Sequence, residues 1–147
     1  MTLDNLLAIH KLVRQAPDKG GIAKLVHAAV RNLADAQLAA LSSDNRFDAA
    51  YKAIMQCAMA ALWANGYRTS TSQPGHHQTA IQTLPKTLGV PAQTVIVLDA
   101  LRKQRNASDY EGDPVSEKAL ASCLDEAARL LAMLQQWLAR EHPDLCE

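Results

Sequence analysis

The pattern of apolar and polar residues along the chain is helical almost throughout, and no segment alternates in the way that a half-buried strand would. Between residues 22 and 40 the apolar positions recur at intervals of three and four: Ile22, Leu25, Val26, Ala29, Leu33, Ala36 and Ala40. This spacing places them on one face of a helix. The segment is therefore predicted to be an amphipathic helix that packs through that face.

The next segment, residues 45–65, is apolar on almost every side. Its polar side chains are confined to one narrow line: Asp48, Lys52 and Gln56. A helix with so little polar surface normally lies at the centre of a bundle. We therefore expect it to be the most buried helix, with Ile54, Ala58 and Ala61 inside the protein, and we expect Gly66 to end it.

The remaining segments predict four more helices. They cover about residues 3–16, 77–88, 91–108 and 120–138, and Pro91 is expected as the first residue of the third. The polar stretch RTSTSQPGHH, residues 68–77, is predicted to be a loop. We therefore predict a single all-α domain, an up-and-down bundle of four to five helices whose core lies in about residues 22–140.

Composition narrows the classes of function. The chain has 147 residues, of which 48% are hydrophobic and 4% aromatic, which favours closely packed helices. Lys+Arg and Asp+Glu are both 15, so the formal net charge is zero. Proteins that bind nucleic acid through bulk electrostatics are usually strongly basic. Any binding of nucleic acid must therefore depend on a local cluster of charges.

The cysteines and the hydropathy pattern predict a cytoplasmic protein. Cys57, Cys123 and Cys146 are odd in number and include no C-x-x-C pair, which is typical of reduced, buried thiols. The N-terminus is too polar for a secretory signal, and no run approaches the ~20 apolar residues of a membrane span. We therefore expect no membrane partner.

Several familiar catalytic patterns are missing from the sequence. It contains no G-x-S-x-G, no phosphate-binding glycine loop and no H-E-x-x-H, and no cofactor is expected. His76 and His77 are adjacent but lack the spacing of metal ligands, so no metal site is predicted. Two interpretations of this pair stay open, because histidines in a polar loop can be merely solvated or can contribute to binding.

The stretch LRKQRNASDYEG, residues 101–112, is the strongest candidate for a site. In one helix Arg102, Arg105, Asn106 and Asp109 share a face that differs from the buried face. Arg105 and Asp109 are four residues apart and are expected to pair, leaving Arg102 freer to meet a ligand. A guanidinium held in this way suits a phosphate or a carboxylate. The alternative is a solvated helix end, since basic residues in a last turn complement the helix dipole.

Arg105-Asn106 followed by Asp109-Tyr110 reads R-N-x-x-D-Y, which resembles a variant found in HEPN domains. These helical domains are often encoded beside minimal nucleotidyltransferases. The segment NRFDAAYKAIMQCAMAALWANGYR is similar to their central helix, and PGHHQTAIQTLPKTLG resembles the segment that links their two helical pairs. The resemblance spans about residues 22–139.

The resemblance implies a four- to five-helix bundle that forms a homodimer. In the ribonuclease toxins of the family, an arginine and a histidine with four to six residues between them act in a cleft shared by both protomers. The matching residues are Arg105, which would bind phosphate, and Asn106 beside it. Residues 110–112, where the histidine would lie, are Tyr110, Glu111 and Gly112. The resemblance thus supports the fold and a binding site better than it supports cleavage of RNA.

Three functions follow as alternatives. The first is a HEPN-like homodimer that binds RNA, a nucleotide or a partner nucleotidyltransferase antitoxin, as the toxin-like member of a toxin–antitoxin pair. The second is a metal-independent endoribonuclease. The third is a helical interaction module without ligand chemistry. The residues assigned to catalysis are Arg105, Asn106 and Tyr110, and those assigned to binding are Arg102, Asp109, His76 and His77.

Overall fold

The computed structural model describes residues 2–146 and confirms the all-α bundle. Within these residues, six α-helices account for most of the chain and are joined by two short strands and one 3-10 turn. In chain order the elements are α1 (Leu3–Ala8), β1 (Leu12–Arg14), α2 (Lys19–Ala36), α3 (Ser43–Ala64), β2 (Tyr67–Thr69), α4 (His76–Thr87), α5 (Ala92–Glu111), α6 (Glu117–Glu141) and η1 (Pro143–Leu145).

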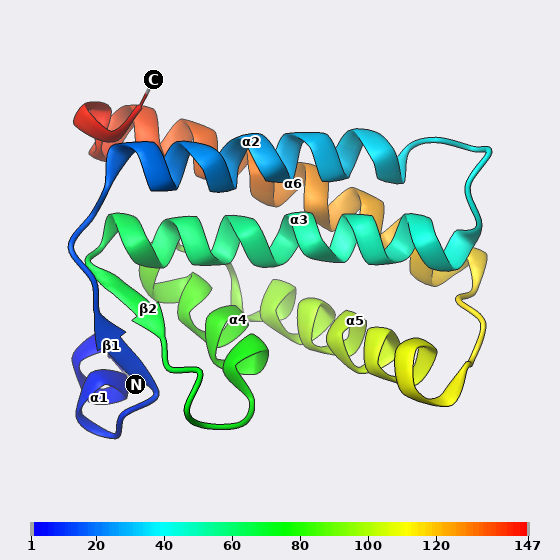
Figure 1. The fold of residues 1–147 in the computed structure, drawn as a ribbon, viewed down its shortest axis with the longest axis horizontal. Coiled ribbons are helices and arrows are strands. Elements are labelled where there is room, and N and C mark those ends of the chain that lie inside the picture. The colour runs from blue at the N-terminus through cyan, green and yellow to red at the C-terminus, as the bar shows by residue number, and fades with distance from the viewer. Residues whose placement is uncertain (1, 147) are drawn as a thin grey trace.

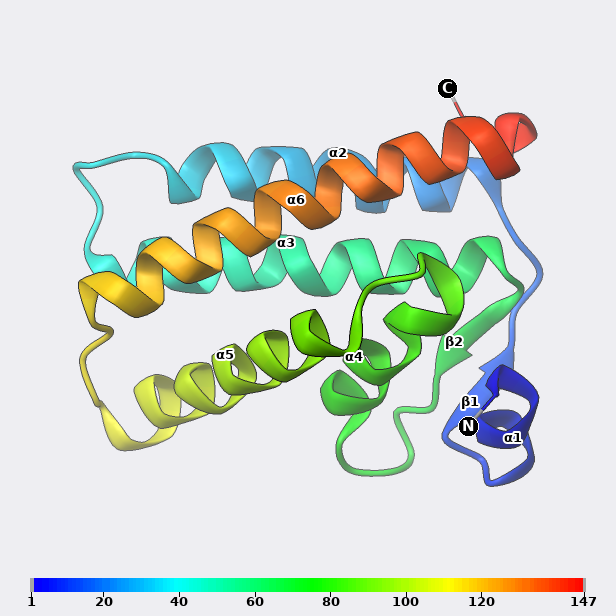
Figure 2. The ribbon, with the colours of Figure 1, turned by 180° about the vertical axis from the view of Figure 1, so that it is seen from behind.

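The four long helices run in alternating directions, as predicted for an up-and-down bundle (Figure 1). Helix α3 lies in the middle and packs against α2, α4, α5 and α6. Helix α6 crosses behind α2 and α3 in Figure 1 and in front of them in Figure 2. Helices α4 and α5 lie below α3 in both views, on the side of α3 that is away from α2. The bundle therefore brings the short helix α4 beside α5.

Helix α3 is the buried centre of the bundle, which confirms the prediction. Ile54 is 1% exposed, and Ala58 and Ala61 are fully buried. Six of its twelve buried residues are alanines, whose small side chains let neighbouring helices approach closely. At its start the Ser42 hydroxyl accepts a hydrogen bond from the Asn45 N–H, which caps the first turn.

Gly21 and Trp63 fix the position of the N-terminal segment against α3. A Cβ atom at Gly21 would lie 2.0 Å from the Trp63 ring, so only glycine fits beneath the indole. The indole Nε1 donates a hydrogen bond to the carbonyl of Ala16, with a distance of 2.8 Å. Gly21, which follows Gly20 directly, thus has a packing role.

The predicted helix over residues 3–16 is wrong in its second half. Helix α1 ends at Ala8, His10 adopts a positive φ of 63°, and β1 follows, antiparallel to β2 with Val13 opposite Arg68. The expectation that no strand would occur is therefore wrong here. The physical reason is tertiary, because Leu12 is buried in a small cluster with Leu6, Leu62 and Tyr67.

Several helix boundaries also differ from the prediction. Helix α2 ends at Ala36, so Ala40 lies in an exposed turn. Helix α5 begins after Pro91, which is its N-cap, and it continues to Glu111. Gly112 ends it, with a φ of +74° that favours glycine.

The predicted burial of the cysteines holds for two of the three. Cys57 and Cys123 are buried free thiols, and Cys146 is partly exposed. Burial raises the pKa of both buried thiols to about 12, so neither is a reactive thiolate at neutral pH. Across residues 2–146 we find no helix with the length and apolarity that a membrane span requires.

Candidate phosphate-binding site

An open hollow of about 320 Å³ lies between the start of α4 and the second half of α5. It contains every residue predicted for the site except Asp109. Its lining residues are Gly75, His76, His77, Gln78, Arg102, Arg105, Asn106 and Tyr110. The structure therefore joins two segments that are separate in the sequence, the histidine pair and the arginine-rich end of α5.

Arg105 lines this hollow with a side chain that is 25% exposed, and Arg102 beside it is 17% exposed. Its Nε lies 2.8 Å from a carboxylate oxygen of Asp109 and 3.7 Å from one of Asp48. The predicted Arg105–Asp109 pair is thus confirmed as an ion pair. The Nε–H is not directed at either oxygen, and within residues 2–146 this buried nitrogen has no hydrogen-bond partner.

Arg102 is not the free cation that we expected. Its Nε donates a hydrogen bond of 2.8 Å to Asp99, one turn earlier in α5. This hydrogen bond lowers the pKa of Asp99, so the carboxylate is ionised at neutral pH. The i,i+3 spacing of Asp99 and Arg102 was the signal for this pair in the sequence. Arg102 still lines the hollow, but a carboxylate holds it in place.

The histidines begin α4 and do not belong to a loop, so this helix starts one residue earlier than predicted. Gly75 is the N-cap, with a left-handed φ of +81°. Among the described residues, no side chain accepts a hydrogen bond from the first turn of α4. The N–H groups and the positive end of the helix dipole therefore face the hollow without a side-chain cap, an arrangement that favours anions.

Tyr51 of α3 contacts residues on both sides of the hollow, and the sequence analysis did not assign it to the site. Its hydroxyl oxygen lies 3.2 Å from Nδ1 of His77, and the Arg105 guanidinium carbon lies 5.6 Å from its ring centre. The side chain is 2% exposed, and burial raises its pKa to about 12. Tyr51 therefore keeps its hydroxyl proton. It lies one turn after Asp48, beside the polar line of α3, but this position alone does not distinguish it from a core tyrosine.

The contact with Tyr51 determines which nitrogen of His77 carries a proton. A buried hydroxyl hydrogen needs an acceptor, and Nδ1 supplies one, so the neutral ring keeps its proton on Nε2. Burial lowers the pKa of His77, and the nearby charges of His76, Arg105 and Arg102 lower it further. His77 is thus a neutral hydrogen-bond donor at pH 7.

The remaining residues form the rim. Tyr110 is 80% exposed at the last turn of α5, and Asn106 lies one turn before it. The rings of His76 and His77 meet edge to face, with centroids 4.7 Å apart. Among the described residues, no group of three or more His, Cys, Asp or Glu side chains could hold a metal ion. The donors of this hollow, guanidinium, imidazole and helix N–H groups, suit an oxyanion.

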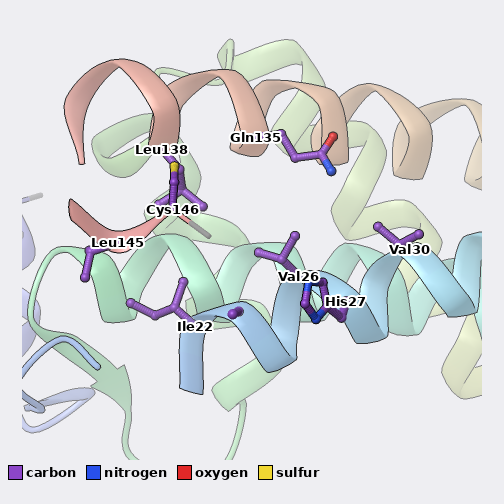
Figure 3. Close-up of a pocket in the computed structure, with 9 residues that line it drawn as sticks. Ile22, Val26, His27, Val30, Gln135, Leu138, Leu145 and Cys146 are labelled. Carbon is purple, nitrogen blue, oxygen red and sulfur yellow. The ribbon is translucent and has the colours of Figure 1, made fainter. Parts of the chain in front are cut away.

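A second hollow, between α2 and α6, differs in character (Figure 3). Ile22, Val26 and Leu138 form much of its wall, and the polar side chains of His27 and Gln135 lie along it. It holds no cluster of arginines like the one on α5. The hollow between α4 and α5 is therefore better suited to an anion than this one.

The chain was compared with models of protein families and with curated protein sequences, and neither comparison gave a match.

Proposed function

We propose that the protein is a HEPN-like module that binds a phosphate group of RNA or of a nucleotide in the hollow between α4 and α5. One observation carries the proposal: the uncapped start of α4 and two arginines of α5 converge on the same open space. A helix N-terminus and guanidinium groups are the two commonest protein partners of phosphate. The R-N-x-x-D-Y pattern, which resembles HEPN domains, lies on this same wall.

The balance of charge supports a local mode of binding. The formal net charge is zero, so no long-range field draws nucleic acid to the protein. Affinity must then come from a few direct contacts, of which Arg105 is the central one. Its side chain lines the hollow and is 25% exposed, so an oxyanion bound there could accept a hydrogen bond from the guanidinium.

The test is calorimetric titration with pyrophosphate and with a short oligoribonucleotide. Arg105→Ala should bind both ligands between about tenfold and a hundredfold less tightly than the wild type, because a hydrogen bond to a charged group contributes about 1.5–3 kcal/mol. Arg129→Ala is the matched control, since Arg129 is an exposed arginine of α6 that also pairs with an aspartate four residues away. Equal binding by wild type and Arg105→Ala would refute the proposal and favour the interaction module.

A metal-independent endoribonuclease is the second candidate, and the place of His76 favours it. The segment after Arg105 has no histidine, but α4 brings His76 to the same hollow. The neutral His77 would donate to a phosphate oxygen, and His76 would accept the proton of the attacking 2′-hydroxyl. The 2′-oxygen would then bond to phosphorus while the bond from phosphorus to the 5′-oxygen breaks, and the leaving 5′-oxygen would take a proton from water. Cleavage should then persist in EDTA, should spare DNA of the same sequence, and should be lost in His76→Ala. Cleavage that His76→Ala does not affect would exclude this role.

We also propose that the chain forms a homodimer around the hollow and that its partner is a minimal nucleotidyltransferase, as the HEPN resemblance implies. The exposed ring of Tyr110 at the rim supports a contact surface there. In a two-fold dimer the same patch meets its own copy, so Tyr110→Asp should weaken it. Light scattering at micromolar concentration measures this, and a monomeric mass of the wild type would contradict the dimer.

A further inference from the structure

A pocket of about 330 Å³ lies in the groove between α4 and α5, beside the phosphate-binding hollow. Its lining includes Gln78, Ile81, Gln82, Val95, Ile96 and Asp99. Unlike the hollow, it has mainly apolar walls, and Ile96, at 62% exposed, has the most exposed large aliphatic side chain among the described residues. This exposed isoleucine gives a ligand an apolar surface to cover.

The pocket and the hollow adjoin each other. Gln78 lines both of them. The ion pair between Arg102 and Asp99 lies at their boundary, with the arginine lining the hollow and the aspartate lining the pocket. A ligand with an anionic end and an apolar end could therefore occupy both, and it would pass a carboxylate midway.

The side chains of the pocket match the chemistry of a nucleoside. A nucleobase has two apolar faces and an edge of donors and acceptors, so it needs apolar walls and a few amides. Val95 and Ile96 offer the walls, and the exposed Gln78 and Gln82 lie on the same face of α4, four residues apart. The ionised carboxylate of Asp99 can accept hydrogen bonds from ribose hydroxyls, which would lie between base and phosphate.

We infer that the hollow and the pocket together bind one nucleotide unit, with its phosphate at Arg105 and its base between Gln82 and Ile96. This inference rests on the proposed phosphate binding and adds the base, which a bare phosphate or a phosphopeptide lacks. The unit can belong to a free nucleotide or to RNA, because both present the same base, ribose and phosphate.

The experiment compares ligands that differ in one part. Ribose 5-phosphate, the four nucleoside monophosphates and a trinucleotide are titrated against the full chain by calorimetry. At least one monophosphate should bind about tenfold or more tightly than ribose 5-phosphate, in the range that a filled pocket contributes. A tighter trinucleotide would identify RNA as the source, and a tighter monophosphate would identify a free nucleotide.

Variants separate the two parts of the site. Gln82→Ala and Ile96→Ser change exposed side chains, so both variants should fold. Both should bind the monophosphates about fivefold to tenfold less tightly than the wild type and should bind ribose 5-phosphate with unchanged affinity. Val30→Ser, at an exposed aliphatic residue of α2, is the matched control and should change the affinity for neither the monophosphates nor ribose 5-phosphate. Arg105→Ala should weaken every ligand.

Two outcomes would overturn the inference, and they are distinguishable. If ribose 5-phosphate binds as tightly as every monophosphate, or if Gln82→Ala and Ile96→Ser bind like wild type, no base occupies the pocket, although phosphate binding at Arg105 stands. If no ligand binds to the wild type, the proposed function and the nucleotide site fail together.

Discussion

The hydroxyl oxygen of Tyr51 lies 3.2 Å from Nδ1 of His77, so a residue of the central helix holds the imidazole that lines the candidate site. The two residues come from α3 and α4, and the guanidinium of Arg105 lies over the same tyrosine ring. Tyr51 thus connects the buried core to both walls of the hollow. Its role is to position His77.

Removing this hydroxyl should change the protonation of His77. In Tyr51→Phe the neutral ring loses the donor to Nδ1 that keeps its proton on Nε2, whereas the burial and the charges of His76, Arg105 and Arg102 that lower the pKa of His77 remain. Nitrogen-15 NMR should show the Nε2–H form in the wild type and a mixture of neutral forms in the variant.

Tyr67→Phe is the matched control for this change. Its hydroxyl donates to Asp4 of α1, with a distance of 2.7 Å, and neither residue lines the hollow. The variant therefore loses a hydroxyl and a hydrogen bond but should leave the spectrum of His77 unchanged. A wild-type His77 that carries its neutral proton on Nδ1 would contradict the assigned role of Tyr51.

The lowered pKa of His77 also predicts how stability depends on pH. The folded state resists protonation of His77, whereas the unfolded state binds the proton near pH 6.5. The unfolded state therefore holds more protons below that pH, and the free energy of unfolding should fall as the pH drops from 6.5 toward the folded pKa. The His77→Asn variant has no titratable side chain at this position, so its free energy of unfolding should depend less on pH over this range. Urea unfolding at pH 7.5 and 5.5 measures it, and equal slopes in the two proteins would contradict it.

The Arg105–Asp109 pair can be tested against an exposed pair of the same spacing. Asp109→Ala should cost about 1 kcal/mol, because the pair is partly buried and Asp48 still lies 3.7 Å from Arg105. Asp125→Ala removes the partner of Arg129, where both side chains are at least 60% exposed, and should cost under about 0.5 kcal/mol. Thermal and urea unfolding provide both values. No difference between the variants would mean that Arg105 behaves as solvated surface.

Asp109→Ala should also tighten the binding of pyrophosphate. The aspartate competes with a bound anion for the same guanidinium, and its removal makes the hollow more positive. Binding weaker than that of the wild type would show instead that Asp109 is needed to hold Arg105 in place.

Neighbouring glycines should respond in opposite directions to the same substitution. Gly21→Ala would place a methyl group 2.0 Å from the Trp63 ring and should destabilise by about 1–3 kcal/mol, the usual cost of overpacking. At Gly20 the nearest atom to an added Cβ is 3.8 Å away, so Gly20→Ala should stabilise by up to about 1 kcal/mol through helix propensity. Chemical denaturation distinguishes them, and two variants of equal stability would refute the packing role of Gly21.

The long helices could be predicted because each repeats its apolar pattern over several turns. The near-complete apolar surface of α3 was enough to place it at the centre. The strands could not be predicted, because each has only three residues and neither is long enough to show alternation. They form because Leu12 and Tyr67 are buried together, a contact between residues far apart in the sequence.

The candidate site could likewise be predicted only where its residues belong to one helix. Spacing within one helix predicts that Arg102, Arg105, Asn106 and Asp109 share a face, and the structure places them so. The approach of His77 to Arg105 depends on how α4 packs beside α5, which no local pattern encodes. Tyr51 was missed for that reason, since a tyrosine in a buried helix is usually core.

The geometry of the guanidinium gives the last prediction. Arg105→Lys keeps the charge at the site but replaces a planar fork of donors by a single ammonium, so it should still bind pyrophosphate about tenfold less tightly than the wild type. Because net charge is zero and few phosphate contacts are made, the dependence on salt should be shallow in both proteins, with a slope that corresponds to one or two released counterions. Titrations between low and moderate salt measure both quantities. Full rescue by lysine, or a steep slope, would mean that diffuse positive charge and not a directed fork at Arg105 binds the anion.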